Sequence, residues 1–256
     1  MNIECKATDN AAIAYLRDMY RHDMHCQITK DSLHIRPGWT TPYLVTVDGA
    51  PAAYGAVAHA GPWKDKPIIF EFFVLPGQRH RTIRLFREFV IAAGTRSIET
   101  QTNGTMLGVL VQSFCPSVVA EAIVYEDKIH TSMSIRGAVV RPVTKEDAGQ
   151  IAARQLDDGA KWLVQLGDQI AGTGGILYHY NRPYGDIFMA ITEPFRRRGL
   201  GAFLVQELKR ICYEQGSIPA ARCNVDNTAS QLTLQKAGFV PCGNIVTGTL
   251  KETFGV

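Results

Sequence analysis

The stretch "EPFRRRGLGAFLVQEL", residues 193–208, places three arginines directly before two glycines. The preceding piece, "DIFMAITE", is short, apolar and partly β-branched, which predicts a buried strand. After the glycines, apolar residues recur at helical spacing from Leu200 to Cys212, and Gly216 predicts the end of that helix. Residues 196–201 are therefore expected to form a turn from a strand into a helix.

A turn of this composition suits an anionic ligand. The first turn of a helix has unpaired N–H groups and a partial positive charge, which attract phosphate. Glycines at 199 and 201 lack the β-carbons that would hold a diphosphate away from the backbone, and arginines add charge-assisted hydrogen bonds. An ordinary solvated basic turn is the alternative, and the pattern by itself leaves it open.

Other nucleotide-binding motifs are absent or incomplete. The chain has no Gly-Lys-Ser/Thr, which excludes a Walker-type phosphate loop. "GTGGIL", residues 172–177, has Leu177 where a dinucleotide fingerprint requires its third glycine. This segment is expected to lie in a strand, where its glycines predict a bulge or a close backbone approach.

Composition limits the class of protein. The chain has 256 residues, 46% hydrophobic and 20% charged, which is typical of a soluble globular protein. A net charge of +3 gives no expectation of nucleic-acid binding. The start "MNIECKATDN" predicts no signal peptide, and no apolar run is long enough to predict a membrane span. Six scattered cysteines indicate reduced thiols and a cytoplasmic location. Because "HDMHC" (22–26) has no second ligand cluster, we expect no metal site.

The order of expected elements repeats along the chain. Each half has a strand and a capped helix, an acidic-glycine hairpin, two further strands and two further helices, with the hairpins at Asp48-Gly49 and Gly167-Asp168. This repetition predicts domains at 1–135 and 136–256, although one α+β domain with similar pieces remains possible. Each half is expected to end in a pair of strands, at 119–125 with 131–135 and at 239–243 with 245–250.

Two linked motifs in the second half resemble those of the GNAT superfamily of acyl-CoA N-acyltransferases. An Arg-x-x-Gly-x-Gly signature matches Arg196, Gly199 and Gly201. A later Asn-x-x-Ala/Ser…Lys-x-Gly-Phe signature matches residues 227–239. The resemblance is strong over about 138–250 and weak in the first half. It implies an α+β fold of two tandem GNAT-like domains, each a mixed, mostly antiparallel sheet flanked by helices.

The same resemblance implies the site residues. Those expected to bind acyl-CoA are Ala190, Ile191, Arg196, Arg197, Arg198, Gly199, Leu200, Gly201, Ala202, Asn227 and Ser230. A backbone N–H near Ala190–Ile191 would polarise the thioester carbonyl. Asp186 lies where several relatives have a general base, with Glu193 as a second candidate. Asp186 could equally just end the turn at 184–186.

Both halves also depart from the family pattern. Leu234 stands where many relatives have a tyrosine that protonates the departing thiolate, so this acid is missing. Tyr178, Tyr180 and Tyr184 are nearby, and we expect them to pack or to shape an acceptor pocket. In the first half, Arg81 and Ile83 replace the two glycines, which predicts a degenerate half without a coenzyme site.

The resemblance implies an N-acetyltransferase that uses acetyl-CoA as its co-substrate. The acceptor would be a primary amine of a small molecule or a peptide, with no nucleic-acid or membrane partner. Two alternatives stay open: a non-catalytic acyl-CoA-binding sensor, which the missing tyrosine favours, and an aminoacyl-tRNA-dependent transferase of similar tandem fold. The acceptor, the acyl length and the oligomeric state do not follow from the sequence.

Overall fold

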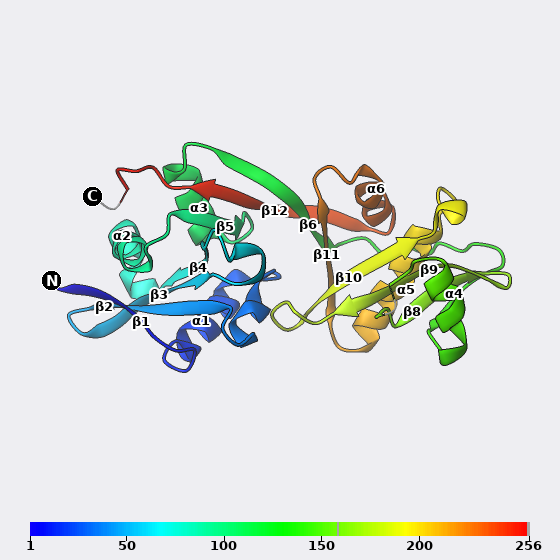
Figure 1. Cartoon of the computed structure of the whole chain (residues 1–256), viewed down its shortest axis with the longest axis horizontal. Helices are drawn as coiled ribbons and strands as arrows, with labels where there is room; N and C mark the ends of the chain where they lie inside the picture. Colours follow the sequence, from blue (N-terminus) through cyan, green and yellow to red (C-terminus); the bar gives the residue numbers. More distant parts are fainter. Residues whose placement is uncertain (158, 255–256) are drawn as a thin grey trace. The chain divides into compact units, whose positions relative to one another are not determined.

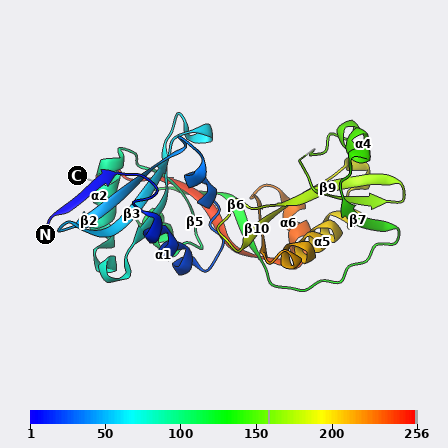
Figure 2. The same ribbon diagram turned by 90° about the horizontal axis from the view of Figure 1, so that it is seen from below.

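The structure, a computed structural model, describes residues 1–157 and 159–254. The chain forms two compact units, one of Met1–Ala122 with Gly243–Val256 and the other of Ile123–Cys242. Each unit combines a β-sheet with helices (Figures 1 and 2), as expected for an α+β fold. Within the described ranges, no helix has the length and apolar character needed to cross a membrane.

The first unit is built on a sheet of strand order β1-β2-β3-β4-β5-β12. Neighbouring strands are antiparallel except β4 and β5, which are parallel. Its strands are β1 (Ile3–Ala7), β2 (Thr40–Val47), β3 (Ala50–Ala58), β4 (Ile68–Val74) and β5 (Ser97–Gln101). Its helices are α1 (Ala14–Met24), α2 (Thr82–Ala93) and α3 (Thr105–Phe114), with 3-10 turns at Asp31–Ile35, Gly61–Trp63 and Pro76–Arg81.

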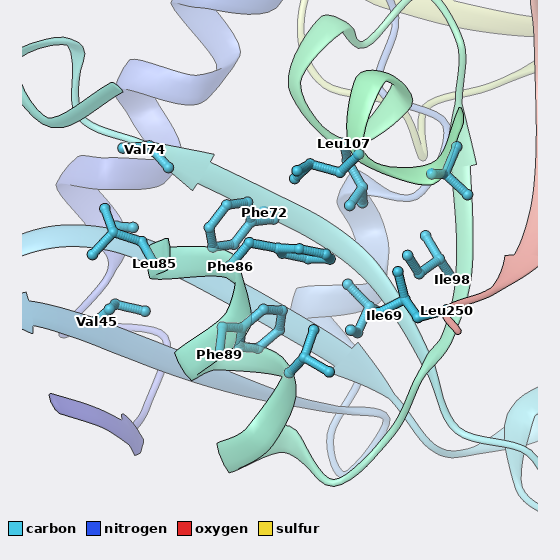
Figure 3. Packing of buried hydrophobic residues seen from close by; sticks show 14 of the residues in the cluster. Val45, Ile69, Phe72, Val74, Leu85, Phe86, Phe89, Ile98, Leu107 and Leu250 are labelled. Carbon is cyan, nitrogen blue, oxygen red and sulfur yellow. The ribbon is translucent and has the colours of Figure 1, made fainter. Parts of the chain in front are cut away.

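Aromatic packing of α2 on the sheet forms the core of this unit (Figure 3). Phe72 of β4 stacks on Phe89 of α2, with ring centroids 5.6 Å apart, and meets Phe86 edge-on at 4.9 Å. The ring of Phe89 also lies against Gly55 of β3, where a β-carbon would be 2.4 Å from the ring. Gly55 therefore makes room for the helix to approach the sheet.

The second unit has the strand order β6-β11-β10-β9-β8-β7. The pairs β7–β8, β8–β9 and β9–β10 are antiparallel, and β10 and β11 are parallel. Its strands are β7 (Ala138–Pro142), β8 (Trp162–Leu166), β9 (Gln169–Leu177), β10 (Tyr184–Ile191) and β11 (Ile218–Asn224). Its helices are α4 (Ala148–Ala153), α5 (Leu200–Glu214) and α6 (Thr228–Lys236), with 3-10 turns at Lys145–Asp147 and Glu193–Phe195. Strands β6 (Val118–Asp127) and β12 (Phe239–Thr249) both continue from one unit into the other.

The glycines of "GTGGIL" lie in β9 and have packing roles, as the sequence predicted. A β-carbon on Gly174 would lie 2.7 Å from the Phe188 carbonyl oxygen and 3.0 Å from the side chain of Leu208 on α5. A β-carbon on Gly172 would be 2.3 Å from the Ala190 carbonyl oxygen. The register between β8 and β9 also shifts between Val164 and Gln165. These glycines let α5 and β10 approach β9 closely.

The two units share one topology. In each unit, three antiparallel strand pairs are followed by one parallel pair. A helix connects the two parallel strands: α2 connects β4 to β5, and α5 connects β10 to β11. Both hairpin predictions are confirmed, because Asp48-Gly49 and Gly167-Asp168 form the turns, with positive φ at Asp48, Gly49 and Gly167. The expectation of two tandem domains with mixed, mostly antiparallel sheets is thus confirmed.

Two expectations about the closing strands were wrong. Residues 131–135 form no strand, because the Gln206 side chain takes the place of a neighbouring strand: its amide donates to the Met133 carbonyl and its carbonyl accepts from the Met133 N–H, at 3.1 and 2.7 Å. Residues 239–243 and 245–250 are not two strands but the single strand β12. The division at 135/136 stays a prediction about the repeated halves.

Candidate functional site

A cavity of about 990 Å³ lies in the second unit, where the sequence predicted an anion site. It is lined by the end of β10, the turn into α5 and one face of α6. The lining includes these predicted residues: Ala190, Ile191, Glu193, Arg196, Arg197, Gly199, Leu200, Gly201, Ala202, Asn227 and Ser230. Arg198 and Asp186 are not among them.

The turn has the backbone conformation of an anion cradle. Arg197 and Gly199 both adopt left-handed conformations, with φ of +61° and +79°. Gly199 is the residue before α5, so the amides of Leu200, Gly201 and Ala202 have no acceptor within the helix. Such a turn points N–H groups outward at the positive end of the helix dipole. Gly199 is suited to its place by its backbone conformation, because a β-carbon there would have only ordinary contacts.

The three arginines have different surroundings. The Arg196 Nε donates to the Ile191 carbonyl at 3.0 Å, which fixes the turn against the end of β10. The guanidinium of Arg198 lies 5.5 Å over the ring of Phe195. Arg197 is exposed, lines the cavity and has no such contact among the described residues. Of the three side chains, Arg197 is thus the freest to contact an anion.

Packing between α5 and α6 requires a glycine at position 201, which the sequence analysis did not predict. A β-carbon there would lie 3.2 Å from Cγ2 of Thr233, a tighter contact than nearly all real β-carbons make. Gly201 therefore permits the close approach of α5 to α6, which together form the cavity wall. The two glycines of the motif thus serve different purposes: one sets the turn and the other sets the helix spacing.

Helix α6 supplies the opposite wall. Asn227 caps it, because its side-chain oxygen accepts from the Ser230 N–H at 3.0 Å. Lining residues that the sequence analysis did not include among its site residues are Met189, Phe195, Thr228, Ala229, Leu232, Thr233 and Lys236. The spacing of Ala229, Leu232, Thr233 and Lys236 along one helix face could have indicated most of this wall. Cations outnumber carboxylates in the lining, with Arg196, Arg197 and Lys236 against Glu193.

The parallel strands β10 and β11 separate next to this cavity. They are paired only from Tyr184 to Asp186 against Ile218 to Ala220, although both strands continue beyond. The Pro183 carbonyl accepts from the Ile218 N–H, whereas the Thr192 N–H donates to the Ala171 carbonyl on the β9 side. By strand alternation, Ile187, Met189 and Ile191 direct their peptide groups toward the gap, and Ala190 directs its own toward β9. The gap thus offers backbone hydrogen-bonding groups to an extended ligand.

Asp186 lies where the separation begins, within a cluster of polar side chains. Its carboxylate is 8% exposed, 3.0 Å from His179 Nε2 and 3.6 Å from Arg222 Nε. The ring of Tyr180 lies edge-on to that of His179, with centroids 4.7 Å apart, and under the guanidinium of Arg222. Burial, with the nearby Asp186 charge, raises the pKa of Tyr180 well above its ordinary value. The sequence did not indicate that His179 and Arg222 belong here.

Leu234 is 4% exposed and packs into the core of the second unit. The position that carries a tyrosine in many relatives is thus filled by a core side chain here. Another phenol, that of Tyr125 on β6, is buried nearby with Cys223 Sγ 4.0 Å from its oxygen. Burial and Cys223 raise the pKa of Tyr125 to about 12. Neither residue lines the cavity.

The corresponding turn of the first unit has another geometry. The 3-10 turn Pro76–Arg81 leads directly into α2, and none of its residues has positive φ. Both the N–H and the hydroxyl of Thr82 donate to the Arg79 carbonyl, which consumes a donor that an anion would need. A separate cavity of about 830 Å³ lies between this turn and α3, lined in part by Arg79, His80 and Arg81.

Metal ligation has no support in the part of the chain that the structure describes. There, no three or more His, Cys, Asp or Glu side chains are grouped as a metal site would need. The six cysteines are free thiols, and three of them, Cys115, Cys212 and Cys223, are buried. Burial raises the pKa of Cys212 to about 11, so it is a neutral thiol at ordinary pH.

Comparison with known proteins agrees with this geometry. The family model described as "Acetyltransferase (GNAT) family" matches residues 127–239, whereas no curated protein matches. A GNAT acetyltransferase from Colwellia psychrerythraea is 13% identical, with a TM-score of 0.74 over 98% of this chain and 100% of that one.

Two further solved structures share the fold over nearly the whole chain. A GCN5-related N-acetyltransferase from Sphaerobacter thermophilus is 17% identical, with a TM-score of 0.59 over 96% of this chain and 94% of that one. A tandem GNAT protein from the clavulanic acid biosynthesis pathway is 13% identical, with a TM-score of 0.60 over 96% and 97%. The chain thus has a tandem GNAT fold, and its residues 127–239 match the model of the GNAT acetyltransferase family.

Proposed function

We propose that the second unit binds acetyl-CoA and transfers its acetyl group to a primary amine. The observation that carries this proposal is the gap between β10 and β11, which leads from Asp186 to the cationic cavity at residues 196–202. From Asp186 to Ile191 the strand rises about 16 Å. An extended pantetheine arm fits along such a strand, with its pyrophosphate at the turn and its thioester near Asp186.

The phosphate end is assigned to the turn and to α6. The amides of Leu200, Gly201 and Ala202 would donate to the pyrophosphate, and Arg197 and Lys236 would add charge-assisted bonds. Asn227 and Ser230 form the cap of α6 at the cavity edge. Arg196 acts mainly through its bond to the Ile191 carbonyl, and Arg198 through its contact with Phe195.

The arm would pair with the peptide groups that face the gap. The peptide groups of Met189 and the N–H of Ile191 point away from β9, so they can bond the amides of an extended ligand, while the Ile191 carbonyl accepts from Arg196. The N–H of Ile187 or Met189, closest to Asp186, is then the donor for the thioester carbonyl, where it would stabilise the developing oxyanion. Ala190 would contribute contact surface rather than this N–H.

Of the two carboxylates proposed for acid–base chemistry, Asp186 is in the better place. Glu193 is exposed and lies at the phosphate end of the cavity, beside Arg196 and Arg197. Asp186 lies where the strands separate, at the other end of the proposed arm. An alkylamine has a pKa of about 10.4 in water, so its proton must be removed before it attacks the thioester. The proton-accepting group therefore belongs to the Asp186 cluster.

Consistent with six free cysteines, we place the protein in the cytoplasm.

The test is acetyl transfer measured against binding. Purified protein is incubated with acetyl-CoA and a panel of primary amines: spermidine, an aminoglycoside and peptides with a free α-amine or a lysine. Release of coenzyme A thiol together with an acetylated product by mass spectrometry is expected for at least one amine. Tight binding of acetyl-CoA without acetylation of any amine would contradict the transferase and favour the second candidate.

That second candidate is a protein that binds acyl-CoA without turning it over. It rests on Leu234, because this buried leucine cannot protonate a departing thiolate. We favour turnover, since a thiolate with a conjugate-acid pKa of about 8.5 leaves far more readily than an amine. A general acid would add least to such a leaving group.

A further inference from the structure

Of the side chains in the Asp186 cluster that can accept a proton at ordinary pH, His179 is the more exposed. The Asp186 carboxylate is 8% exposed, whereas the His179 side chain is 22% exposed. A general base must come within hydrogen-bonding distance of the proton that it removes, or within one water of it. One oxygen of the Asp186 carboxylate, Oδ2, is also approached by His179 Nε2 at 3.0 Å and by Arg222 Nε at 3.6 Å. With 8% of its side chain exposed, the carboxylate offers an incoming amine little surface.

The two ring nitrogens of His179 have different surroundings. Nε2 is buried and lies 3.0 Å from the Asp186 carboxylate, at an angle that falls short of good hydrogen-bond geometry. Catalytic contacts of this kind often tighten only when ligands bind. Nδ1 has no partner within residues 1–157 and 159–254. A carboxylate beside Nε2 favours the tautomer with the proton on that nitrogen, which leaves the lone pair on Nδ1.

The neighbours hold the ring in place and set its charge environment. Tyr180 packs edge-on against the His179 ring, and Arg222 lies over Tyr180 and beside Asp186. The charged and titratable groups facing the ring are therefore Asp186, Arg222 and Tyr180. The raised pKa keeps the Tyr180 phenol neutral at ordinary pH.

We propose that His179, positioned by Asp186, is the general base of the acetyl transfer; this rests on the proposed function. The amine nitrogen attacks the thioester carbonyl carbon, and its proton passes to Nδ1 of His179 directly or through one water. The new C–N bond forms as the C–S bond breaks, and the electron pair leaves with the thiolate. The proton held by His179 then returns to the thiolate or to solvent, which restores the neutral ring. Asp186 is a positioning residue in this scheme.

The principal test compares three variants with the amine that gives acetylation. His179→Gln should lower kcat about 100-fold or more and remove the acid limb of the pH–rate profile, with acetyl-CoA affinity unchanged. Asp186→Asn should lower kcat less and displace that limb rather than remove it. His22→Gln is the control, because His22 is an exposed histidine of the other unit. If Asp186→Asn abolished the limb and His179→Gln kept it, Asp186 would be the base and the proposal would be overturned.

A second measurement does not depend on turnover. Diethyl pyrocarbonate modifies neutral imidazoles, and peptide mass spectrometry reports the rate at each histidine. Acetyl-CoA should protect His179 and leave His22 unchanged. Equal modification of His179 with and without acetyl-CoA would overturn its place beside the thioester. Protection without acetylation of any amine would instead reject the proposed transferase and keep His179 at the thioester end of the site.

Discussion

Gly199 and Gly216 have nearly the same left-handed backbone, with φ of +79° and +73°, in different surroundings. Gly199 lines the cavity at the start of α5, whereas Gly216 follows its end with open space around it. A β-carbon in this conformation costs about 1–2 kcal/mol wherever it occurs. The pair therefore separates the conformational role of a glycine from its role in binding.

We predict that Gly199→Ala and Gly216→Ala destabilise the chain to a similar extent but affect coenzyme A binding differently. Gly199→Ala should move the turn amides and weaken at least one charge-assisted bond, at about 1.5–3 kcal/mol. Affinity should therefore fall about tenfold or more. Calorimetric titration with coenzyme A measures this, and thermal unfolding verifies the matched stability loss. Wild-type affinity in folded Gly199→Ala protein would remove the turn from the binding site.

Asp147 provides a pH-dependent contribution to stability. Its carboxylate accepts two hydrogen bonds of 2.7 Å from Arg141 and bonds the Thr144 N–H in a capping box. The Arg141 guanidinium and the Thr144 bonds hold the pKa of Asp147 well below its usual range. A carboxyl with a lowered folded-state pKa stabilises the fold above its unfolded pKa of about 3.9. That stabilisation is lost as the pH falls toward the folded value.

Asp147→Asn should lower the free energy of unfolding by about 1–2 kcal/mol at pH 7. The difference from wild type should shrink as the pH falls below about 4. Denaturant unfolding between pH 7 and pH 3 measures it, with Asp168→Asn on the exposed β8–β9 turn as the control. A constant difference at every pH would show that the carboxylate charge is not the cause.

At the scale of elements, helix spacing within the second unit depends on one small contact. Gly201 of α5 faces Thr233 of α6. A β-carbon added at Gly201 would lie 3.2 Å from Cγ2 of Thr233. The Thr233 hydroxyl donates to the Ala229 carbonyl at 2.8 Å, a bond that serine can keep. Replacing Thr233 by serine therefore removes the facing methyl group alone.

Gly201→Ala should gain helix propensity, up to about 1 kcal/mol, but lose more through its contact with Thr233. Thr233→Ser should relieve that contact. The double variant should therefore be destabilised by less than the sum of the two single changes in the free energy of unfolding. Coupling energies between residues in contact are about 0.5–3 kcal/mol. A double-mutant cycle by urea unfolding measures the coupling. Strict additivity would mean that the two helices separate freely at this point.

At the scale of the whole molecule, the two units differ at the turn that we propose binds the coenzyme. The first unit keeps a cavity of about 830 Å³ and the cations Arg79, His80 and Arg81. Its turn lacks left-handed residues, and the Thr82 N–H is already bonded. The turn of the first unit therefore has positive charge but lacks backbone amides arranged to bind a diphosphate.

Titration with coenzyme A should accordingly saturate at one equivalent per chain. Arg197→Ala should lower the affinity about tenfold, whereas Arg81→Ala, its counterpart in the first unit, should leave it nearly unchanged. Isothermal calorimetry gives both the affinity and the stoichiometry. Two sites of similar affinity would show that the first half is not degenerate.

The C-terminal segment belongs to the first unit, which the sequence repeat did not indicate. Residues Ile245–Thr249 of β12 pair antiparallel with β5, and Val246, Leu250 and Phe254 are buried in the core of that unit. Burying such side chains contributes about 1.5–3 kcal/mol each, so their sum is comparable to the stability of a whole domain.

A chain that ends after Cys242 should lose the folded first unit. Limited proteolysis should then cleave within residues 1–122 at least tenfold faster than in the full chain. A chain that ends after Leu250 keeps the pairing with β5 and loses only Phe254 of these three, so it should be intermediate. Wild-type protease resistance in the shorter chain would show that β12 contributes little to the first unit.

The sequence by itself determined most of the elements and the turn from β10 into α5, which we propose binds phosphate. Apolar periodicity located α5, Asn227 marked the start of α6, and arginines next to glycines marked the turn, because these signals act between residues close in the chain. The tertiary structure alone decided which distant residues meet. His179 and Arg222 reach Asp186 only when β9, β10 and β11 are side by side, Gln206 replaces a strand partner for Met133, and β12 joins the first unit. The Arg222, Gln206 and β12 contacts join residues 36, 73 and more than 100 positions apart, and the His179 contact, 7 positions apart, depends on how the β9–β10 loop folds back. None of them leaves a local periodicity to read.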